Sequence, residues 1–163
     1  MLLRVSSDVF LVDPHFHPDK KAYLDSLHAI LNVAYNDESK RFGAMKFHTK
    51  VVIAKNSSDQ SESIWIDEFH KSCERELPRI IPKGRSLDVV LWKVKADGEA
   101  FHARYVLTDI GGISVDHGLD TPSSQQTTDI HWLMDSELKE RWRDFLGNGK
   151  IFLRVAQKTY LGR

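Results

Sequence analysis

The sequence predicts an α/β protein in which a mixed β-sheet is flanked by helices. Short apolar segments rich in β-branched residues alternate with longer segments whose apolar residues recur every three or four positions. The segments follow the order strand, helix, strand, helix, three strands, helix, strand, which combines crossover connections with a hairpin. The length of 163 residues suits one domain with a substantial core, and no internal repeat divides it. We therefore expect a single domain over residues 1–163.

The first two elements are a buried strand and an amphipathic helix. Residues 8–13, DVFLVD, are apolar and β-branched, and the Asp13-Pro14 pair should end the strand. A helix should follow from about Pro18 to Asn36, because its apolar residues form one stripe. The residues of this stripe are Tyr23, Leu24, Leu27, Ile30, Leu31 and Ala34.

Two more strands and a helix should follow in the middle of the chain. We expect strands at 46–54 and 86–95, because both segments are short and rich in valine. Between them, a serine-rich loop offers helix-capping residues to a helix at about 61–76. We expect Pro78 and Pro82 to end this helix.

Residues 101–120, FHARYVLTDIGGISVDHGLD, predict a β-hairpin that carries the first candidate site. His102 and Arg104 are two positions apart, so on a strand they leave the same face, about 7 Å from each other. Asp109 precedes a pair of glycines that should form the turn, and the segment ISV should be the returning strand.

The last part of the chain should contain a loop, a helix and a strand. The polar segment 121–128, TPSSQQTT, predicts a surface loop. A helix should run from Asp135 or Ser136 to about Leu146, where glycines stop it. A final strand is expected at 151–156.

The spacing H-x-R-x4-D, formed by His102, Arg104 and Asp109, resembles the H-x-K-x4-D signature of the phospholipase D superfamily. A closer resemblance is to the phospholipase D-like domain at the C-terminus of MIT-domain proteins. That branch also tolerates arginine in the motif and has a Gly-Leu-Asp after the hairpin, as at residues 118–120 here. It also opens with a strand that ends in Asp-Pro plus an aromatic residue, which is similar to residues 12–16. The order of the elements agrees over nearly all of the chain.

This resemblance implies a single phospholipase D-like lobe and a metal-independent phosphodiesterase or nuclease that needs no cofactor. His102 would attack phosphorus and form a phosphohistidine, and Arg104 would hold the non-bridging oxygens. Asp109 would orient a histidine or the cation, and Asp120 would be a peripheral polar contact of the substrate. One motif per chain implies a homodimer in which the second copy's histidine protonates the leaving group. The chain could equally be one domain of a larger multidomain assembly.

The exchange of lysine for arginine leaves a non-catalytic alternative open. A planar guanidinium and a compact ammonium place charge differently, so the exchange weakens the case for catalysis and keeps the case for phosphate binding. The chain would then be a module that binds phospholipid or a protein partner. A structural reading also stands, in which His102 is a half-buried histidine and Arg104 forms a surface ion pair with Asp109.

Asp13, His15 and His17 form a second constellation, D-x-H-x-H, at the predicted end of the first strand. The string resembles the first-strand motif of metal-dependent amidohydrolases and PHP phosphoesterases, and predicts a small metal-dependent hydrolase as an alternative. Those enzymes use barrels, and an eightfold barrel typically needs about 250 residues. Otherwise these residues should be substrate contacts that line the same pocket as His102, because strand ends in α/β sheets gather at ligand sites.

Composition limits the partners and the compartment. The chain has 23 Lys and Arg residues and 23 Asp and Glu residues, so a phosphodiester-containing ligand, nucleic acid or phospholipid, would need a local basic patch. The single cysteine, Cys73, excludes an internal disulfide and should be a small core residue. We see neither a transmembrane segment nor a signal peptide and expect a cytoplasmic protein.

Overall fold

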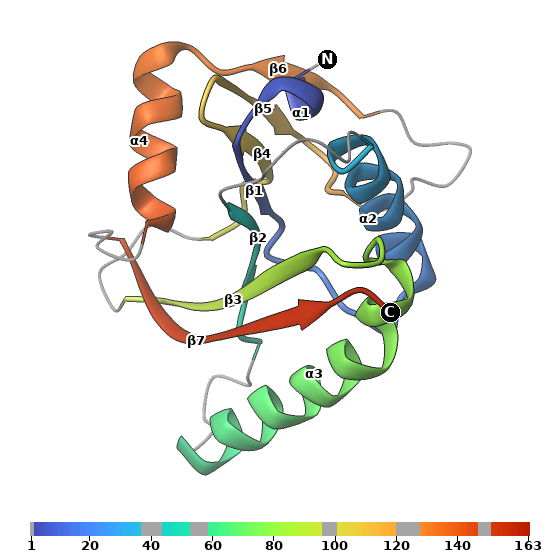
Figure 1. Cartoon of the computed structure of the whole chain (residues 1–163). Helices are drawn as coiled ribbons and strands as arrows, with labels where there is room; N and C mark the ends of the chain where they lie inside the picture. Colours follow the sequence, from blue (N-terminus) through green and yellow to red (C-terminus); the bar gives the residue numbers. More distant parts are fainter. Residues whose placement is uncertain (1, 37–43, 53–58, 96–100, 120–127, 147–150) are drawn as a thin grey trace.

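The computed structural model describes residues 2–36, 44–52, 59–95, 101–119, 128–146 and 151–163. Within these residues, seven strands form one mixed sheet with helices on both of its faces (Figure 1). In chain order the elements are α1 (Leu2–Val5), β1 (Asp8–Val12), α2 (Lys21–Ala34), β2 (Ala44–Lys50), α3 (Asp59–Ile80), β3 (Ser86–Val94), β4 (Tyr105–Thr108), β5 (Gly111–Val115), β6 (Ile130–Trp132), α4 (Asp135–Phe145) and β7 (Phe152–Leu161).

The sheet has the strand order β6-β5-β4-β1-β2-β3-β7. β1, β2 and β3 are parallel and are connected through α2 and α3, whereas β4 pairs with β1, and β7 with β3, in antiparallel orientation. β4, β5 and β6 form an antiparallel meander on the other side of β1. The α/β class with a mixed sheet, predicted from the sequence, is confirmed.

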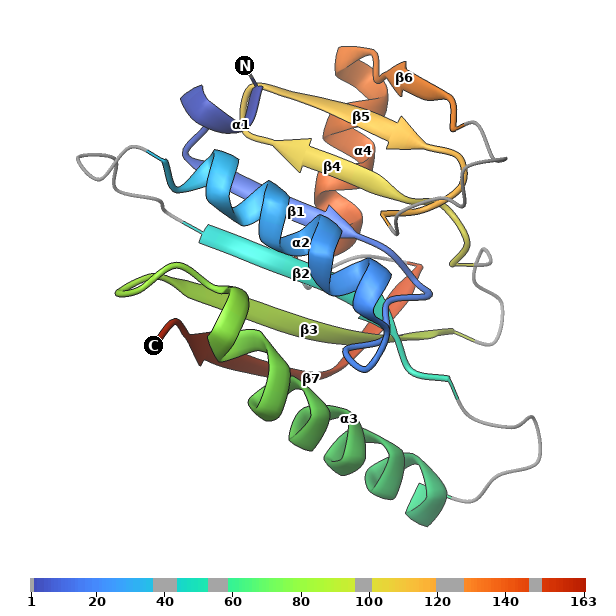
Figure 2. The same ribbon diagram turned by 90° about the vertical axis from the view of Figure 1, so that its right-hand side faces the viewer.

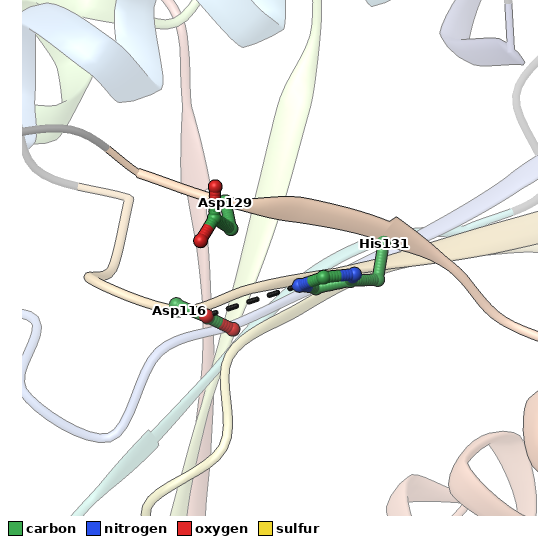
Figure 3. Close-up of side chains that lie close together, drawn as sticks. All are labelled: Asp116, Asp129 and His131. Carbon is green, nitrogen blue, oxygen red and sulfur yellow. Dashed lines mark ion pairs between the residues drawn. The ribbon is translucent and has the colours of Figure 1, made fainter.

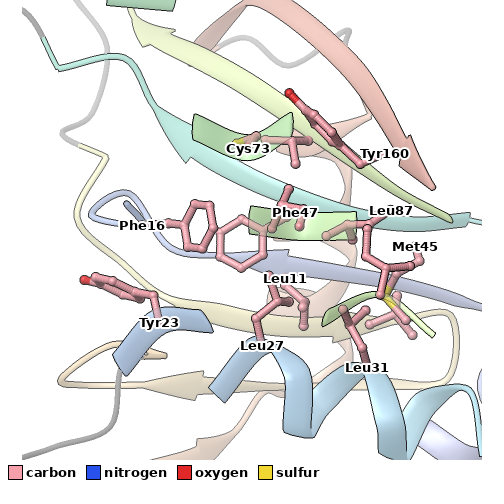
Figure 4. Close-up of a cluster of buried hydrophobic side chains, with 14 of the residues drawn as sticks. Leu11, Phe16, Tyr23, Leu27, Leu31, Met45, Phe47, Cys73, Leu87 and Tyr160 are labelled. Atoms are coloured by element: carbon pink, nitrogen blue, oxygen red, sulfur yellow. The ribbon is translucent and has the colours of Figure 1, made fainter. Parts of the chain in front are cut away.

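α2 and α3 cover one face of the sheet and α4 covers the other (Figure 2). On the first face, Leu11 and Phe47 of the sheet pack with Leu27 and Leu31 of α2 (Figure 4). Cys73 of α3 is fully buried in the same cluster, as predicted. The predicted apolar stripe of α2 is confirmed, because all of its members are buried in this core or packed against it.

On the second face, Phe10 and Trp92 of the sheet pack against Trp142 and Phe145 of α4. The rings of Phe10 and Trp142 lie stacked, with centroids 4.2 Å apart. Successive residues of β1 therefore enter different cores, with Leu11 on one face and Phe10 on the other. This burial on both faces explains why the segment is a continuous apolar run.

Several boundaries differ from the sequence predictions. α3 begins at Asp59 and continues to Ile80, so the expectation that Pro78 ends the helix is wrong. A proline removes one backbone N–H donor, yet the last turn still closes, because the amide of Ile81 donates to the carbonyl of Leu77 at 3.0 Å. β7 extends to Leu161, five residues beyond the predicted end at 156.

Two elements were not predicted, α1 and β6. β6 has three residues, and all of them are exposed at the edge of the sheet. Its strand character comes from pairing with β5, in which Trp132 lies opposite Ile113 and Ile130 opposite Val115. Most of the predicted loop 121–128 lies outside the described residues.

Candidate functional site

The candidate site lies where the end of β1 meets the beginning of β4. These strands are antiparallel, and Val12 is paired with Tyr105. Asp13 directly follows β1, and Arg104 directly precedes β4, so the two residues meet where the carboxyl ends of β1 and β2 lie. This edge of the sheet runs across the ends of its strands and is distinct from the outer strand β6. Lys50 ends the parallel strand β2 and lies at the same edge.

Asp13 organises the backbone of the site. Its side chain is fully buried, with an exposed fraction of 0%. One carboxylate oxygen accepts from the backbone N–H of His15 at 2.9 Å, and the other accepts from the N–H of Leu119 at 2.8 Å. Burial raises the pKa of Asp13, while these two hydrogen bonds and the charge of Arg104 act in the opposite direction. Asp13 thus joins the segment after β1 to the segment after β5.

His15 and His102 lie side by side on the surface. Their ring centroids are 6.4 Å apart, and the ring planes are inclined by 23°. Partial burial lowers the pKa of His15, and the positive charges of Arg104 and Lys50 lower it further. Asp13 acts in the opposite direction, and His102 adds to the lowering. The surroundings of His15 are therefore electropositive, which disfavours its own protonation and favours a bound anion.

Arg104 is half-buried, and its guanidinium is fixed by the backbone. Its Nη1 donates to the carbonyl oxygen of Asp116 at 2.8 Å. Its Nε is buried and has no hydrogen-bond partner among the described residues. The carbonyl of Arg104 in turn accepts from the N–H of Val115 at 3.0 Å, so the pairing of the hairpin continues one residue beyond β4.

Asp109 lies at the opposite end of β4 from His102 and Arg104. The five residue steps from Arg104 to Asp109 correspond to roughly 17 Å along an extended strand. An oxygen of Asp109 accepts from the N–H groups of Ser7 and Asp8, at 2.8 and 3.2 Å. The structure therefore gives Asp109 a role in holding the start of β1, and does not bring it to His102 or into an ion pair with Arg104.

His17 has different neighbours from His15. β1 ends at Val12, and turns follow it, so the strand alternation that would put both imidazoles on one face does not continue. Nδ1 of His17 accepts from the N–H of Asp19 at 3.3 Å. His17 also lines a hollow of about 350 Å³ against α3, together with Trp65. Asp120, the remaining predicted contact, lies outside the described residues.

Asp116, Asp129 and His131 bring their donor atoms within 4.8 Å of one another on the surface (Figure 3). His131 Nε2 lies 3.9 Å from an oxygen of Asp116. In the part of the chain that the structure describes, they are the residues that could jointly hold a metal ion, and Asp13, His15 and His17 do not form such a group. All three side chains are exposed, and carboxylates commonly gather on surfaces without an ion. Sequence analysis missed the trio because strand pairing joins residues that are distant in the sequence.

The chain matches no model of a known protein family, and a comparison with curated proteins finds no match either. None of the helices that the structure describes is long and apolar enough to cross a lipid bilayer. The fold and the site together define an α/β protein with paired histidines and neighbouring cations at one edge of its central sheet.

Proposed function

We propose that the chain binds a phosphate or phosphodiester group at the edge of the sheet that carries His102 and Arg104. The observation that supports this most directly is the convergence of Arg104, Lys50 and His102 on His15. The nearby carboxylate of Asp13 is buried and accepts from two backbone amides, so it is directed into the protein. The site thus presents positive charge to solvent, although the chain as a whole carries no net charge.

Arg104 has the chemistry that phosphate recognition requires. A guanidinium presents N–H groups in a planar fork that matches two oxygens of a phosphate. In Arg104 one nitrogen is fixed on the carbonyl of Asp116, so the fork is oriented before a ligand arrives. Preorganised donors of this kind bind more tightly than donors that must first be ordered.

His102 is the residue that we propose for phosphodiester cleavage, if the bound group is turned over. The resemblance to the phospholipase D superfamily supports it as the nucleophile, and this chemistry needs no metal ion. Asp109 would support the site only indirectly, because it holds the far end of β4 on the start of β1 and does not touch the bound group.

A non-catalytic binding module is the second candidate, and the open character of the site favours it. His15 and His102 are both exposed, so the two imidazoles lie on an open surface. Efficient phosphoryl transfer profits from a site that excludes water, whereas binding a phosphate group on a surface does not require one.

One experiment tests the proposal and separates its two forms. Purified protein is mixed with inorganic phosphate and with a chromogenic phosphodiester, and binding and turnover are measured with and without chelator. Wild type is compared with His102→Ala and Arg104→Gln, and His28→Ala serves as the control, because His28 is an exposed histidine in α2. Chelator-resistant turnover that His102→Ala abolishes supports a phosphodiesterase. Phosphate binding without turnover supports the module, and the absence of any binding contradicts the proposal.

A further inference from the structure

We propose that His15 and His102 of a single chain bind the same phosphate group, so that one chain holds the complete site and needs no second copy of the chain to supply a histidine. The inference rests on the proposed function and adds His15 to it as a ligand contact. It differs from what the resemblance implies, because there the second imidazole comes from another chain.

The spacing of the two rings suits a shared ligand. A hydrogen-bond acceptor can lie about 2.9 Å from each of two donors, so nitrogens up to about 6 Å apart can contact one oxygen. The ring centroids of His15 and His102 are 6.4 Å apart and the planes are inclined by 23°. At this separation, rotation of the two side chains can bring ring nitrogens to one oxygen or to neighbouring oxygens of one phosphate. Arg104 lies close enough to affect the protonation of His15 and supplies a charge at the same place.

The backbone holds both histidines in place although their side chains are exposed. His15 precedes Phe16, which is buried in the core beneath α2 and α3, and its N–H donates to Asp13. His102 follows Phe101, which is buried in the core beneath α4. Each histidine is therefore attached to a phenylalanine anchored in a different core, on opposite faces of the sheet. Such anchoring keeps the two rings together in the absence of ligand and reduces the entropy cost of binding.

The charges around His15 explain what an anion would gain between the rings. Arg104, Lys50 and His102 all disfavour its protonated form, and the carboxylate of Asp13 acts in the opposite direction. A bound phosphate would offset the positive charges of Arg104 and Lys50 and allow the imidazole of His15 to donate a charge-assisted hydrogen bond. Arg104 and Lys50, which disfavour protonation of His15 in the free chain, would then attract the same anion as His15.

The test follows histidine ring resonances by NMR while inorganic phosphate is added at a protein concentration where sedimentation shows a monomer. His15→Gln and His102→Gln are compared with wild type, and His28→Gln is the matched control. We expect the His15 and His102 resonances of the monomer to move with one dissociation constant. Each single variant should bind phosphate about tenfold more weakly, as expected for the loss of one charge-assisted hydrogen bond, and the His28 variant should bind as wild type does.

Three outcomes would overturn the inference. If His15→Gln binds phosphate like wild type while His102→Gln and Arg104→Gln lose binding, His15 is not a contact, although the proposed function survives. If only a dimer binds phosphate, the site is not complete in one chain. If wild type does not bind phosphate in either state, the proposed function fails together with the inference. Amide spectra of the variants check that each substitution leaves the fold intact.

Discussion

Trp92 donates its indole N–H to Nδ1 of His48 at 2.9 Å, in a core from which both side chains are excluded from solvent. Because Nδ1 accepts this bond, the neutral imidazole carries its proton on Nε2, which has no hydrogen-bond partner among the described residues. Complete burial lowers the pKa of His48 well below the ordinary value, and the charge of Lys46 adds to this. His48 is thus a neutral core residue, and its role is structural, unlike that proposed for His15 and His102.

This environment predicts a loss of stability in mild acid. The folded chain keeps His48 neutral, whereas the unfolded chain takes up a proton as the pH falls below the unperturbed value of 6.5. The contribution of neutral His48 to the free energy of unfolding is therefore fully present above pH 6.5. Below that pH it declines by up to about 1.4 kcal/mol per pH unit. Urea unfolding at several pH values should show a steeper decline for wild type than for His48→Gln, whose amide oxygen can still accept from Trp92. An equal decline in both proteins would contradict this, and His28→Gln should behave as wild type.

Asp13→Ala should destabilise the fold and disturb the site together. The substitution removes the acceptor of two backbone N–H groups, those of His15 and Leu119. Leaving buried donors without acceptors costs about 1–3 kcal/mol, and the segment that carries His15 loses its attachment. We expect a lower free energy of unfolding and weaker phosphate binding. Asp25→Ala is the control, because Asp25 forms an exposed ion pair with Lys21, and its loss should change stability by less than about 0.5 kcal/mol. Equal stability of the two variants would show that Asp13 does not tie the segments together.

Asp109→Ala should affect stability and leave phosphate binding unchanged. Asp109 accepts from the N–H groups of Ser7 and Asp8 at the end of β4 that is remote from His102. The loss of these partly solvated bonds should cost roughly 1 kcal/mol or less. The measurements are urea unfolding and phosphate titration of the folded variant. A large loss of phosphate affinity without unfolding would show that Asp109 reaches the site, as its position in the sequence motif suggests.

The positions of Arg104 and Asp109 show how far sequence reasoning reaches. The two-residue alternation predicted for His102 and Arg104 requires a strand, but β4 begins at Tyr105, so both residues precede the strand and do not share a strand face. Both nevertheless lie at the same end of β4. The spacing to Asp109 is equally regular, but it spans the whole of β4. The two ends of an extended strand lie far apart. Arg104 and Asp109 are therefore close in the sequence motif but separated in the structure.

Long-range pairing decided the remaining features of the site. β1 was predictable because its residues are buried on both faces and are therefore apolar throughout. That β1 lies beside β4 follows from pairing between segments about a hundred residues apart, which no local pattern reports. The proximity of His15 and His102 depends on this pairing. The exposed strand β6 and the trio of Asp116, Asp129 and His131 likewise depend on the pairing of β6 with β5.

Arg104→Lys separates charge from geometry at the site. Lysine keeps the positive charge, but it lacks the planar fork and cannot donate to the carbonyl of Asp116 and to two phosphate oxygens in the same arrangement. We expect Arg104→Lys to bind inorganic phosphate a few-fold more weakly than wild type and Arg104→Gln about tenfold more weakly, the latter with a reduced dependence on salt. Titrations at low and high salt measure both effects, and Arg79→Lys is the control, since Arg79 is an exposed residue in the last turn of α3. If Arg104→Lys instead raises phosphodiester turnover, the lysine of the phospholipase D signature supports catalysis better, and the arginine of this chain is specialised for binding. If both Arg104 variants bind phosphate as wild type does, the anion is held elsewhere, and the convergence of charge on His15 has no role in recognition.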